Sequence, residues 1–326
     1  TSLSPSAYTV TISPSDDGVV TVDLGAGVAT DAAGNSNSAA AQVSRTTDNT
    51  APSAEISGPS DAALSGPFAV TITFSEIVSG FTLDDIQVGN GSASDFNATS
   101  EQIYTALITP SDDGPVTVDV AANAAEDAAG NGNLAADRFS TFNDATSPTV
   151  TLSRAGNGLA AGPFDVTINF SEPVSGLALE NLAVSNGAAS ALTGSEAQYA
   201  VTITPTTDAE VTIDLAAGVA VDAAGNPNLA ADTLRVSVDS TAPVLTIDLP
   251  GATTEGAFTA RFTFDERVSG FEASDIIVTN GAVSDFMIES DRSFTALITP
   301  ATAGLITVEV ASAAASDQAG NGNEAA

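Results

Sequence analysis

The chain repeats itself about every 95 residues, and this tandem pattern limits its fold more than any other sequence feature. The segment Asp-Ala-Ala-Gly-Asn begins at Asp31, Asp127 and Asp222, and Asp-Gln-Ala-Gly-Asn begins at Asp317, so that the spacings are 96, 95 and 95 residues. A Phe-Ser/Asp-Glu segment and a linker that ends in Pro keep the same spacing. A repeat of this length is too long for a solenoid unit and suits small autonomous domains.

These markers divide the chain into one partial repeat and three longer repeats. Residues 1–47 contain only the second half of a repeat, 48–143 and 144–238 contain whole repeats, and 239–326 stops before a final strand. We therefore interpret the chain as a window from a longer array. The alternative is that another copy supplies the missing strand.

Within each repeat, apolar residues alternate with small or polar residues. This is the period of a half-buried strand, and it is clear over residues 68–74, 104–108 and 116–120. The polar residues 111–114 predict a hairpin turn between the last two of these strands. About seven short strands and no helix are expected per repeat, which predicts a β-sandwich.

The motifs resemble those of a known bacterial family. The run Phe-Ser-Glu-x-Val-Ser-Gly, the Asn-Gly turns at Asn90, Asn186 and Asn280, and the closing Asp-Ala-Ala-Gly-Asn are similar to bacterial immunoglobulin-like repeats. The resemblance covers essentially the whole chain and implies an all-β tandem array of immunoglobulin-like sandwich domains. Such repeats build the extension regions of giant adhesins and other large surface proteins. The resemblance therefore implies an extracellular or cell-surface location.

The composition removes most enzyme chemistry. The chain has 41 acidic residues and seven basic ones, all arginine, and it has no Lys, His, Cys or Trp. Without His or Cys there is no Ser-His-Asp or Cys-His nucleophile system and no zinc site of the usual nitrogen and sulfur type. Carboxylate-only catalysis would need a cleft between two acids, which a row of small sandwiches does not predict. We expect no enzymatic activity.

The net charge of −34 also limits the partners. Such a surface repels phosphate backbones and anionic headgroups, so nucleic acid is not an expected partner. No apolar run has the length of a membrane span, so membrane insertion is not expected. The expected partners are neighbouring repeats and possibly other copies of the chain, and the sequence does not identify a host or environmental ligand.

The sandwich topology predicts where the acids meet. The linker aspartate, the glutamate that closes the second strand, and the aspartate of Asp-Ala-Ala-Gly-Asn should converge at one end of each repeat. The turn before each linker adds further candidates. The predicted triads are Asp48, Glu76 and Asp127; Asp144, Glu172 and Asp222; and Asp239, Glu266 and Asp317. The added candidate ligands are Asp16, Asp17, Asp112, Asp113 and Asp208.

Converging carboxylates repel one another unless something neutralises them. Calcium binds six to eight oxygen ligands, and the linkers resemble those of calcium-rigidified cadherin ectodomains. We therefore predict Ca²⁺ at each junction between repeats, and a non-catalytic stalk as the function. For Asp127 the alternative is a turn cap, and for Asp112 and Asp113 it is an ordinary polar turn. The alternative function is an adhesive or filament-forming module that binds a glycan or protein, or polymerises by strand donation.

Overall fold

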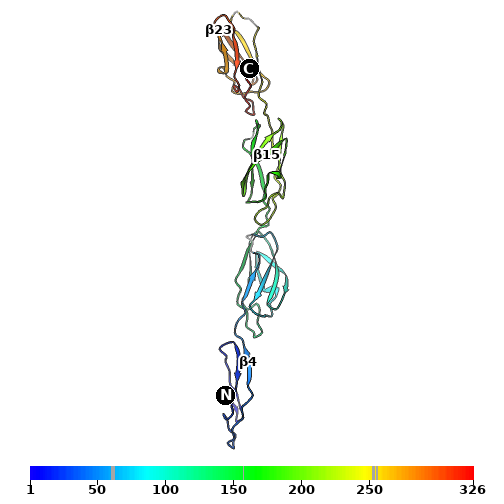
Figure 1. Ribbon diagram of the computed structural model, residues 1–326, viewed down its shortest axis with the longest axis vertical. Helices are drawn as coiled ribbons and strands as arrows, with labels where there is room; N and C mark the ends of the chain where they lie inside the picture. Colours follow the sequence, from blue (N-terminus) through cyan, green and yellow to red (C-terminus); the bar gives the residue numbers. More distant parts are fainter. Residues whose placement is uncertain (60–62, 157, 252–253, 255) are drawn as a thin grey trace. The chain divides into compact units, whose positions relative to one another are not determined.

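A computed structural model describes residues 1–59, 63–156, 158–251, 254 and 256–326 (Figure 1). Its regular structure is almost entirely β, as predicted, and three short 3₁₀ helices are the only helical elements of the described residues: η1 (Leu83–Asp85), η2 (Leu179–Asn181) and η3 (Ala273–Asp275). No helix in these ranges is long and apolar enough to span a bilayer. The chain divides into two compact units, Thr1–Thr146 and Ser147–Ala326.

The first unit begins with the partial repeat. Here β1 pairs with β2 and β3 pairs with β4, both antiparallel. The apolar side chains Tyr8 of β2, Val19 of β3 and Val43 of β4 are 73%, 67% and 66% exposed. Residues 1–47 therefore form paired strands without a closed core. The strands are β1 (Ser2–Ser4), β2 (Ala7–Tyr8), β3 (Gly18–Val22) and β4 (Val43–Thr47).

The second repeat completes the first unit as a sandwich with seven strands among its described residues. One sheet has the order β5-β6-β9-β8 and the other has the order β7-β10-β11. Alternating side chains of both sheets meet in a core that includes Ile72, Ile108 and Val116, all of which are fully buried. The strands are β5 (Ala54–Ser57), β6 (Phe68–Phe74), β7 (Ile86–Gly89), β8 (Gly91–Ala98), β9 (Ile103–Pro110), β10 (Gly114–Val120) and β11 (Phe139–Asn143).

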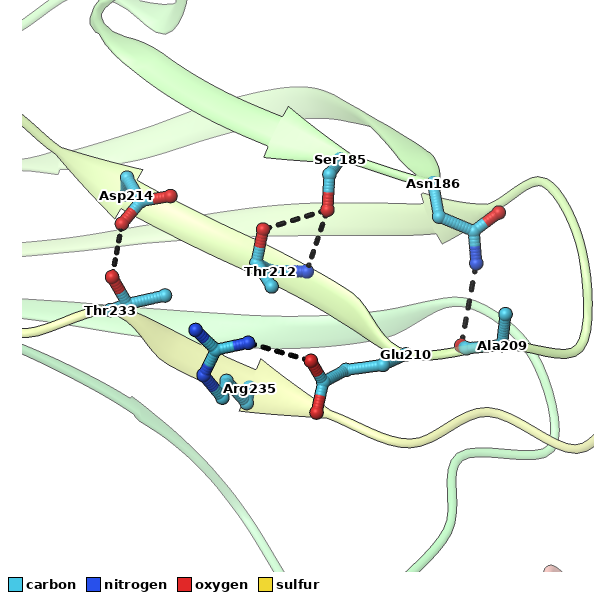
Figure 2. Close-up of polar contacts among 8 residues, drawn as sticks. All are labelled: Ser185, Asn186, Ala209, Glu210, Thr212, Asp214, Thr233 and Arg235. Carbon is cyan, nitrogen blue, oxygen red and sulfur yellow. Dashed lines mark hydrogen bonds and ion pairs between the residues drawn. The ribbon is translucent and has the colours of Figure 1, made fainter.

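The third repeat, in the second unit, has the same topology. Its sheets have the orders β12-β13-β16-β15 and β14-β17-β18, and Ile168, Ile203 and Ile213 are fully buried between them. Polar contacts also join the strands of its smaller sheet, such as the bond from the Thr212 N–H to Ser185 (3.2 Å; Figure 2). The strands are β12 (Val150–Arg154), β13 (Phe164–Phe170), β14 (Leu182–Ser185), β15 (Gly187–Ser195), β16 (Gln198–Pro205), β17 (Val211–Leu215) and β18 (Leu234–Val236).

The fourth repeat follows the same plan with one four-stranded sheet and one two-stranded sheet among its described residues. The orders are β19-β20-β23-β22 and β21-β24. Phe262, Phe264 and Ile298 lie in its core. The strands are β19 (Leu245–Asp248), β20 (Phe258–Phe264), β21 (Ile276–Thr279), β22 (Gly281–Ile288), β23 (Ser293–Pro300) and β24 (Thr307–Val310).

The predicted hairpin at residues 111–114 is wrong in its pairing. The strands on either side of this turn, β9 and β10, belong to different sheets. Strand β9 pairs with β6 and β8, whereas β10 pairs with β7 and β11. Both strands alternate and both bury one face, so sequence periodicity alone cannot tell a hairpin from a turn that crosses between the layers.

Candidate metal centres

Two loops that are distant in sequence pair at one end of the second repeat. Ser79, in the loop after β6, and Glu126, in the loop after β10, exchange backbone hydrogen bonds of 2.8 and 3.0 Å. This pairing holds the two loops side by side. Because Glu76 lies just before Ser79 and Asp127 just after Glu126, their carboxylates meet at this end of the sandwich.

The linker aspartate completes the group. Asp48, Glu76 and Asp127 each place one carboxylate oxygen so that the three oxygens lie within 4.8 Å of one another. In the second unit Asp239, Glu266 and Asp317 do the same. We call these the Asp48 cluster and the Asp239 cluster. The structure thus brings together six of the predicted residues as two triads that could hold a metal ion.

The remaining predicted triad spans the two compact units. Ser175 and Val221 exchange backbone bonds of 2.7 and 3.0 Å, which places Glu172 beside Asp222 in the second unit. Asp144 belongs to the first unit. Its ligation together with Glu172 and Asp222 therefore stays a prediction.

The buried aspartate of each cluster is held by its own turn. The Asp127 Oδ1 accepts hydrogen bonds from the backbone N–H groups of Ala129 (2.8 Å) and Asn131 (2.9 Å), and Oδ2 accepts one from the Asn131 side chain (2.7 Å). The side-chain bond from Asn131 contributes most to lowering the pKa of Asp127. The turn-capping interpretation is therefore confirmed for Asp127. A carboxylate offers about four lone-pair sites, so capping leaves room for a cation.

Sequence reasoning missed the asparagine that closes this segment. The Asn131 side chain also donates to the backbone carbonyl of Asp48 (3.1 Å), and in the second unit Asn321 donates to the carbonyl of Asp239 (2.8 Å). One amide thus joins the turn to the linker. The available signal was the recurrence of Asn at the fifth position of the repeated segment.

The serine of the Phe-Ser-Glu segment was also missed. The Ser75 hydroxyl accepts a bond from the N–H of Ser53 (3.0 Å), and in the fourth repeat Asp265 occupies this place and accepts one from Val244 (2.8 Å). This bond fixes the start of the repeat's first strand beside the glutamate. A hydroxyl or a carboxylate suffices because the position needs only an acceptor.

The glutamate of each cluster has surroundings that disfavour its ionised form. Partial burial raises the pKa of Glu76, and the negative charges of Asp48, Asp127 and Asp17 raise it further. Burial also raises the pKa of Glu266, followed by the charges of Asp317, Asp239 and Asp265, while Arg292 opposes them. Both clusters therefore favour a proton or a cation at the glutamate.

The aspartates of the turn before each linker have a different environment. Asp17 accepts bonds from the Asn49 N–H (2.6 Å) and from the Thr50 hydroxyl, and Asp113 accepts bonds from the Ala145 N–H (2.7 Å) and from the Thr146 hydroxyl. Asp208 accepts bonds from the Ser240 N–H (2.9 Å) and from the hydroxyls of Ser240 and Thr241. The linker hydroxyl bonds contribute most to lowering the pKa values of these three aspartates.

These turn aspartates lie outside the two clusters. Asp16 accepts a bond from the neighbouring Ser15 (2.8 Å), and within the described residues the Asp112 carboxylate accepts no hydrogen bond. The geometry therefore gives Asp17, Asp113 and Asp208 a linker-binding role, and it does not group Asp16 or Asp112 with the acids that could hold a metal.

Several solved structures match this chain at low sequence identity and low TM-score. Invasin, a bacterial integrin-binding protein, is 16% identical with a TM-score of 0.31, and the match covers 78% of this chain and 56% of that one. A tetra-tandem repeat from the extending region of a large adhesion protein is 20% identical with a TM-score of 0.28, covering 95% and 81%. The adhesin InvE of Yersinia pseudotuberculosis is 13% identical with a TM-score of 0.22, covering 74% and 72%.

The chain thus spans little more than half of the invasin structure. No curated protein sequence matches it. The bacterial Ig-like domain family matches residues 48–143, 144–238 and 239–326. These three tandem matches agree with the sandwich topology of the repeats and confirm the family resemblance of the motifs. The chain belongs to the bacterial Ig-like domain family.

Proposed function

We propose that the chain is a non-catalytic spacer, or stalk, in an extracellular bacterial surface protein, and that calcium stiffens the junctions between its repeats. In this proposal the repeat units are residues 1–47, 48–143, 144–238 and 239–326, and the partners are neighbouring repeats. The observation that carries the proposal is the recurrence of the acidic triad in equivalent places, as the Asp48 cluster and the Asp239 cluster.

The donor set favours calcium over other metals. Each cluster offers only oxygen, and the chain has no His or Cys to attract a transition metal. Calcium accepts six to eight oxygen ligands in flexible geometry, whereas magnesium requires a near-ideal octahedron and usually keeps several waters. Three carboxylates supply charge to balance a divalent ion, and water can complete the shell.

A cation in a cluster would restrict the movement of the linker, because its ligands come from the linker and from the sandwich that follows. Asp239 belongs to the linker, whereas Glu266 and Asp317 belong to two loops of the following sandwich. An ion bound by all three ties the linker to that sandwich. Binding to the folded state alone also stabilises it by mass action.

A catalytic role is not proposed. The same acids recur in equivalent positions of successive repeats, whereas an active site usually belongs to one place. Glu76 and Glu266 have raised pKa values, but a cation site explains that shift as well as an acid catalyst would. The family match and the tandem organisation support a structural role.

The test is small-angle scattering and thermal unfolding of the whole chain, with calcium and with a chelator. We expect calcium to raise the unfolding midpoint and to narrow the distribution of dimensions. Asp239→Ala should remove part of both effects, while Asp232→Ala, which removes an exposed aspartate in the third repeat, should not. Midpoints and dimensions that do not respond to calcium would contradict the proposal.

The adhesive or filament-forming alternative predicts a different outcome. A polymerising chain would show a mass that rises with protein concentration in the same scattering experiment, in calcium and in chelator. A ligand-binding module would retain glycans or host proteins in a binding screen of this chain alone. Either result, without a calcium response, would favour the alternative over the stalk.

A further inference from the structure

One threonine in each linker binds two aspartates from different places. The Thr241 backbone N–H donates to the carboxylate of Asp239 (3.2 Å), and its hydroxyl donates to the carboxylate of Asp208. Asp239 belongs to the Asp239 cluster, and Asp208 belongs to the turn between β16 and β17. Thr241 therefore bridges the candidate metal centre and the preceding sandwich.

The same bridge recurs in the other two linkers. Thr50 donates its N–H to Asp48 (3.1 Å) and its hydroxyl to Asp17. Thr146 donates its N–H to Asp144 (3.2 Å) and its hydroxyl to Asp113. Three independent occurrences make an accidental surface contact a poor explanation.

The aspartate at the other end of the bridge is well supplied with donors. Asp208 also accepts bonds from the N–H of Ser240 (2.9 Å) and from its hydroxyl. Hydrogen bonds to an ionised acceptor are roughly twice as strong as neutral ones. This carboxylate therefore needs no cation, in contrast to the crowded acids of the cluster.

The turn that carries Asp208 is itself fixed. The Asn186 side chain donates to the backbone carbonyls of Thr207 (3.1 Å) and Ala209 (3.3 Å), the two neighbours of Asp208, and the bond to Ala209 is drawn in Figure 2. Asn186 has a φ of 52°, a left-handed conformation that Asn tolerates better than most residues. Asp208 is therefore presented from a rigid support.

The sandwich does not need this aspartate to close its turn. The corresponding turn of the fourth repeat, residues 301–304, contains no acid, yet its Thr302 hydroxyl donates to Asn280 (2.7 Å) just as the Thr207 hydroxyl donates to Asn186 (2.7 Å) in the third repeat. The supporting asparagine is thus retained while the aspartate is absent. The role that remains for Asp208 is its contact with the linker.

We infer that Asp208 and Thr241 form a latch that holds linker residues 239–241 without a cation, and that Thr241 positions the Asp239 carboxylate for the cluster. Asp17 with Thr50 and Asp113 with Thr146 are the equivalent latches. The holding role stands on the hydrogen bonds alone, whereas the positioning role rests on the proposed calcium function. With the linker already bound to Asp208, the ion needs only to join Asp239 to Glu266 and Asp317 of the following sandwich.

The first experiment measures amide hydrogen exchange by NMR in chelator. In the unmodified chain the Ser240 amide should be protected, and Asp208→Ala should speed its exchange about tenfold, as expected for losing a bond to a charged acceptor. Thr241→Val should speed it by a smaller factor, and Thr241→Ser, which keeps a hydroxyl, should restore most of the protection. Asp232→Ala is the matched loss of an exposed aspartate and should change nothing.

Core amides show whether a variant has merely lost its fold. The Ile203 amide in β16 should keep its protection in every variant, because these substitutions lie in the turn and the linker. A Ser240 amide that exchanges in the unmodified chain as fast as an unstructured one would overturn the latch. So would an Asp208→Ala variant with unchanged Ser240 exchange.

The second experiment titrates calcium and follows the backbone amides of Asn321 and Asn131, which donate to Asp317 of the Asp239 cluster and to Asp127 of the Asp48 cluster. Thr241→Val should weaken binding at the Asp239 cluster several-fold and leave the Asp48 cluster unchanged as an internal reference. Equal affinities would overturn the positioning role and leave the latch intact. If calcium binds neither cluster of the unmodified chain, the proposed function fails, and the exchange in chelator still decides the latch.

Discussion

The linker at residues 239–241 lies between two groups of acids, the Asp239 cluster and the turn aspartate Asp208. The surroundings of the carboxylates differ between the two groups. Burial and then the like charges around it raise the pKa of Glu266, while Asp208 accepts three hydrogen bonds, which lower its pKa. Both are carboxylates in a very acidic chain. Whether a carboxylate of this chain needs a counterion therefore depends on its burial, its neighbouring charges and its hydrogen-bond donors, and the total number of acids in the chain does not decide it.

The largest expected effect is the rise in unfolding midpoint when calcium binds the Asp48 and Asp239 clusters. At about 100 times the dissociation constant, calcium should raise the unfolding midpoint of a repeat by roughly 10 °C, because an ion bound only to the folded state shifts the equilibrium. Calorimetry with calcium and with chelator measures this shift. Magnesium at the same concentration is the control and should have a smaller effect. A midpoint that is equal in calcium and in chelator would show that the clusters do not bind calcium in the folded state.

The next effect separates the two groups by sign. In chelator, Glu266→Gln should raise the midpoint by roughly 2 to 5 °C because it removes a repelled charge, whereas Asp208→Ala should lower it by a similar amount because it removes a satisfied acceptor. In calcium, Glu266→Gln should lose most of the metal-dependent gain. Shifts of the same sign for both variants in chelator would contradict the distinction.

The pH dependence in chelator should also run in opposite directions. Glu266 has a folded pKa above its usual 4.5, so its protonation contributes stability that is fully present below that value and is lost as pH rises through the folded pKa. Asp208 has a folded pKa below its usual 3.8, so its contribution is present above that value and is lost as pH falls through the folded pKa. Unfolding midpoints from pH 7 to 3 measure both.

We therefore expect the Glu266 contribution to grow as the pH falls from 7 towards 4.5, and the Asp208 contribution to begin to fall near pH 3.8 and to be lost as the pH passes below the folded pKa. Comparison of Glu266→Gln and Asp208→Ala with the unmodified chain isolates each contribution. A Glu266→Gln variant whose pH profile matches that of the unmodified chain would show that the glutamate is not crowded.

The smallest effect concerns an ordinary surface pair. Arg235 and Glu210 form an ion pair of 2.7 Å in the third repeat, with side chains 62% and 49% exposed (Figure 2). Arg235→Gln should cost less than about 1 kcal/mol, because water and salt screen exposed pairs. Chemical denaturation at low and at moderate salt measures this. A larger cost would show that this exposed pair stabilises the third repeat more than exposed ion pairs usually do.

Much of the architecture follows from residues that repeat. The alternation over residues 68–74 and its equivalents predicts half-buried strands, and the structure confirms strands there with their apolar faces in the core. The convergence of Glu76 with Asp127 is also predictable, because both follow strands that end at the same pole of an immunoglobulin-like sandwich. The pairing across the turn at residues 111–114 is not predictable, because either pairing buries the same faces.

The roles of the individual turn acids could not be predicted from the sequence. Asp112 and Asp113 are adjacent and chemically identical, but only Asp113 binds the linker. Asn131 and Thr50 carry no sequence signal of their own beyond recurrence, because their importance lies in two simultaneous hydrogen bonds. A bond of this kind depends on direction and on a distance of about 3 Å, and a one-dimensional pattern contains neither.

The amino-acid sequence alone identifies tandem acidic β-sandwich repeats without histidine, cysteine or lysine chemistry, because the order of residues sets the periodicity and their kinds set the composition. The folded structure was needed to show which acids are satisfied by hydrogen-bond donors and which have raised pKa values. That outcome depends on loop pairing such as Ser269 with Ser316 (2.7 and 3.0 Å), which brings Glu266 and Asp317 together from opposite ends of their repeat. The electrostatic free energy of a carboxylate is set by its neighbours within a few ångströms, and folding chooses those neighbours.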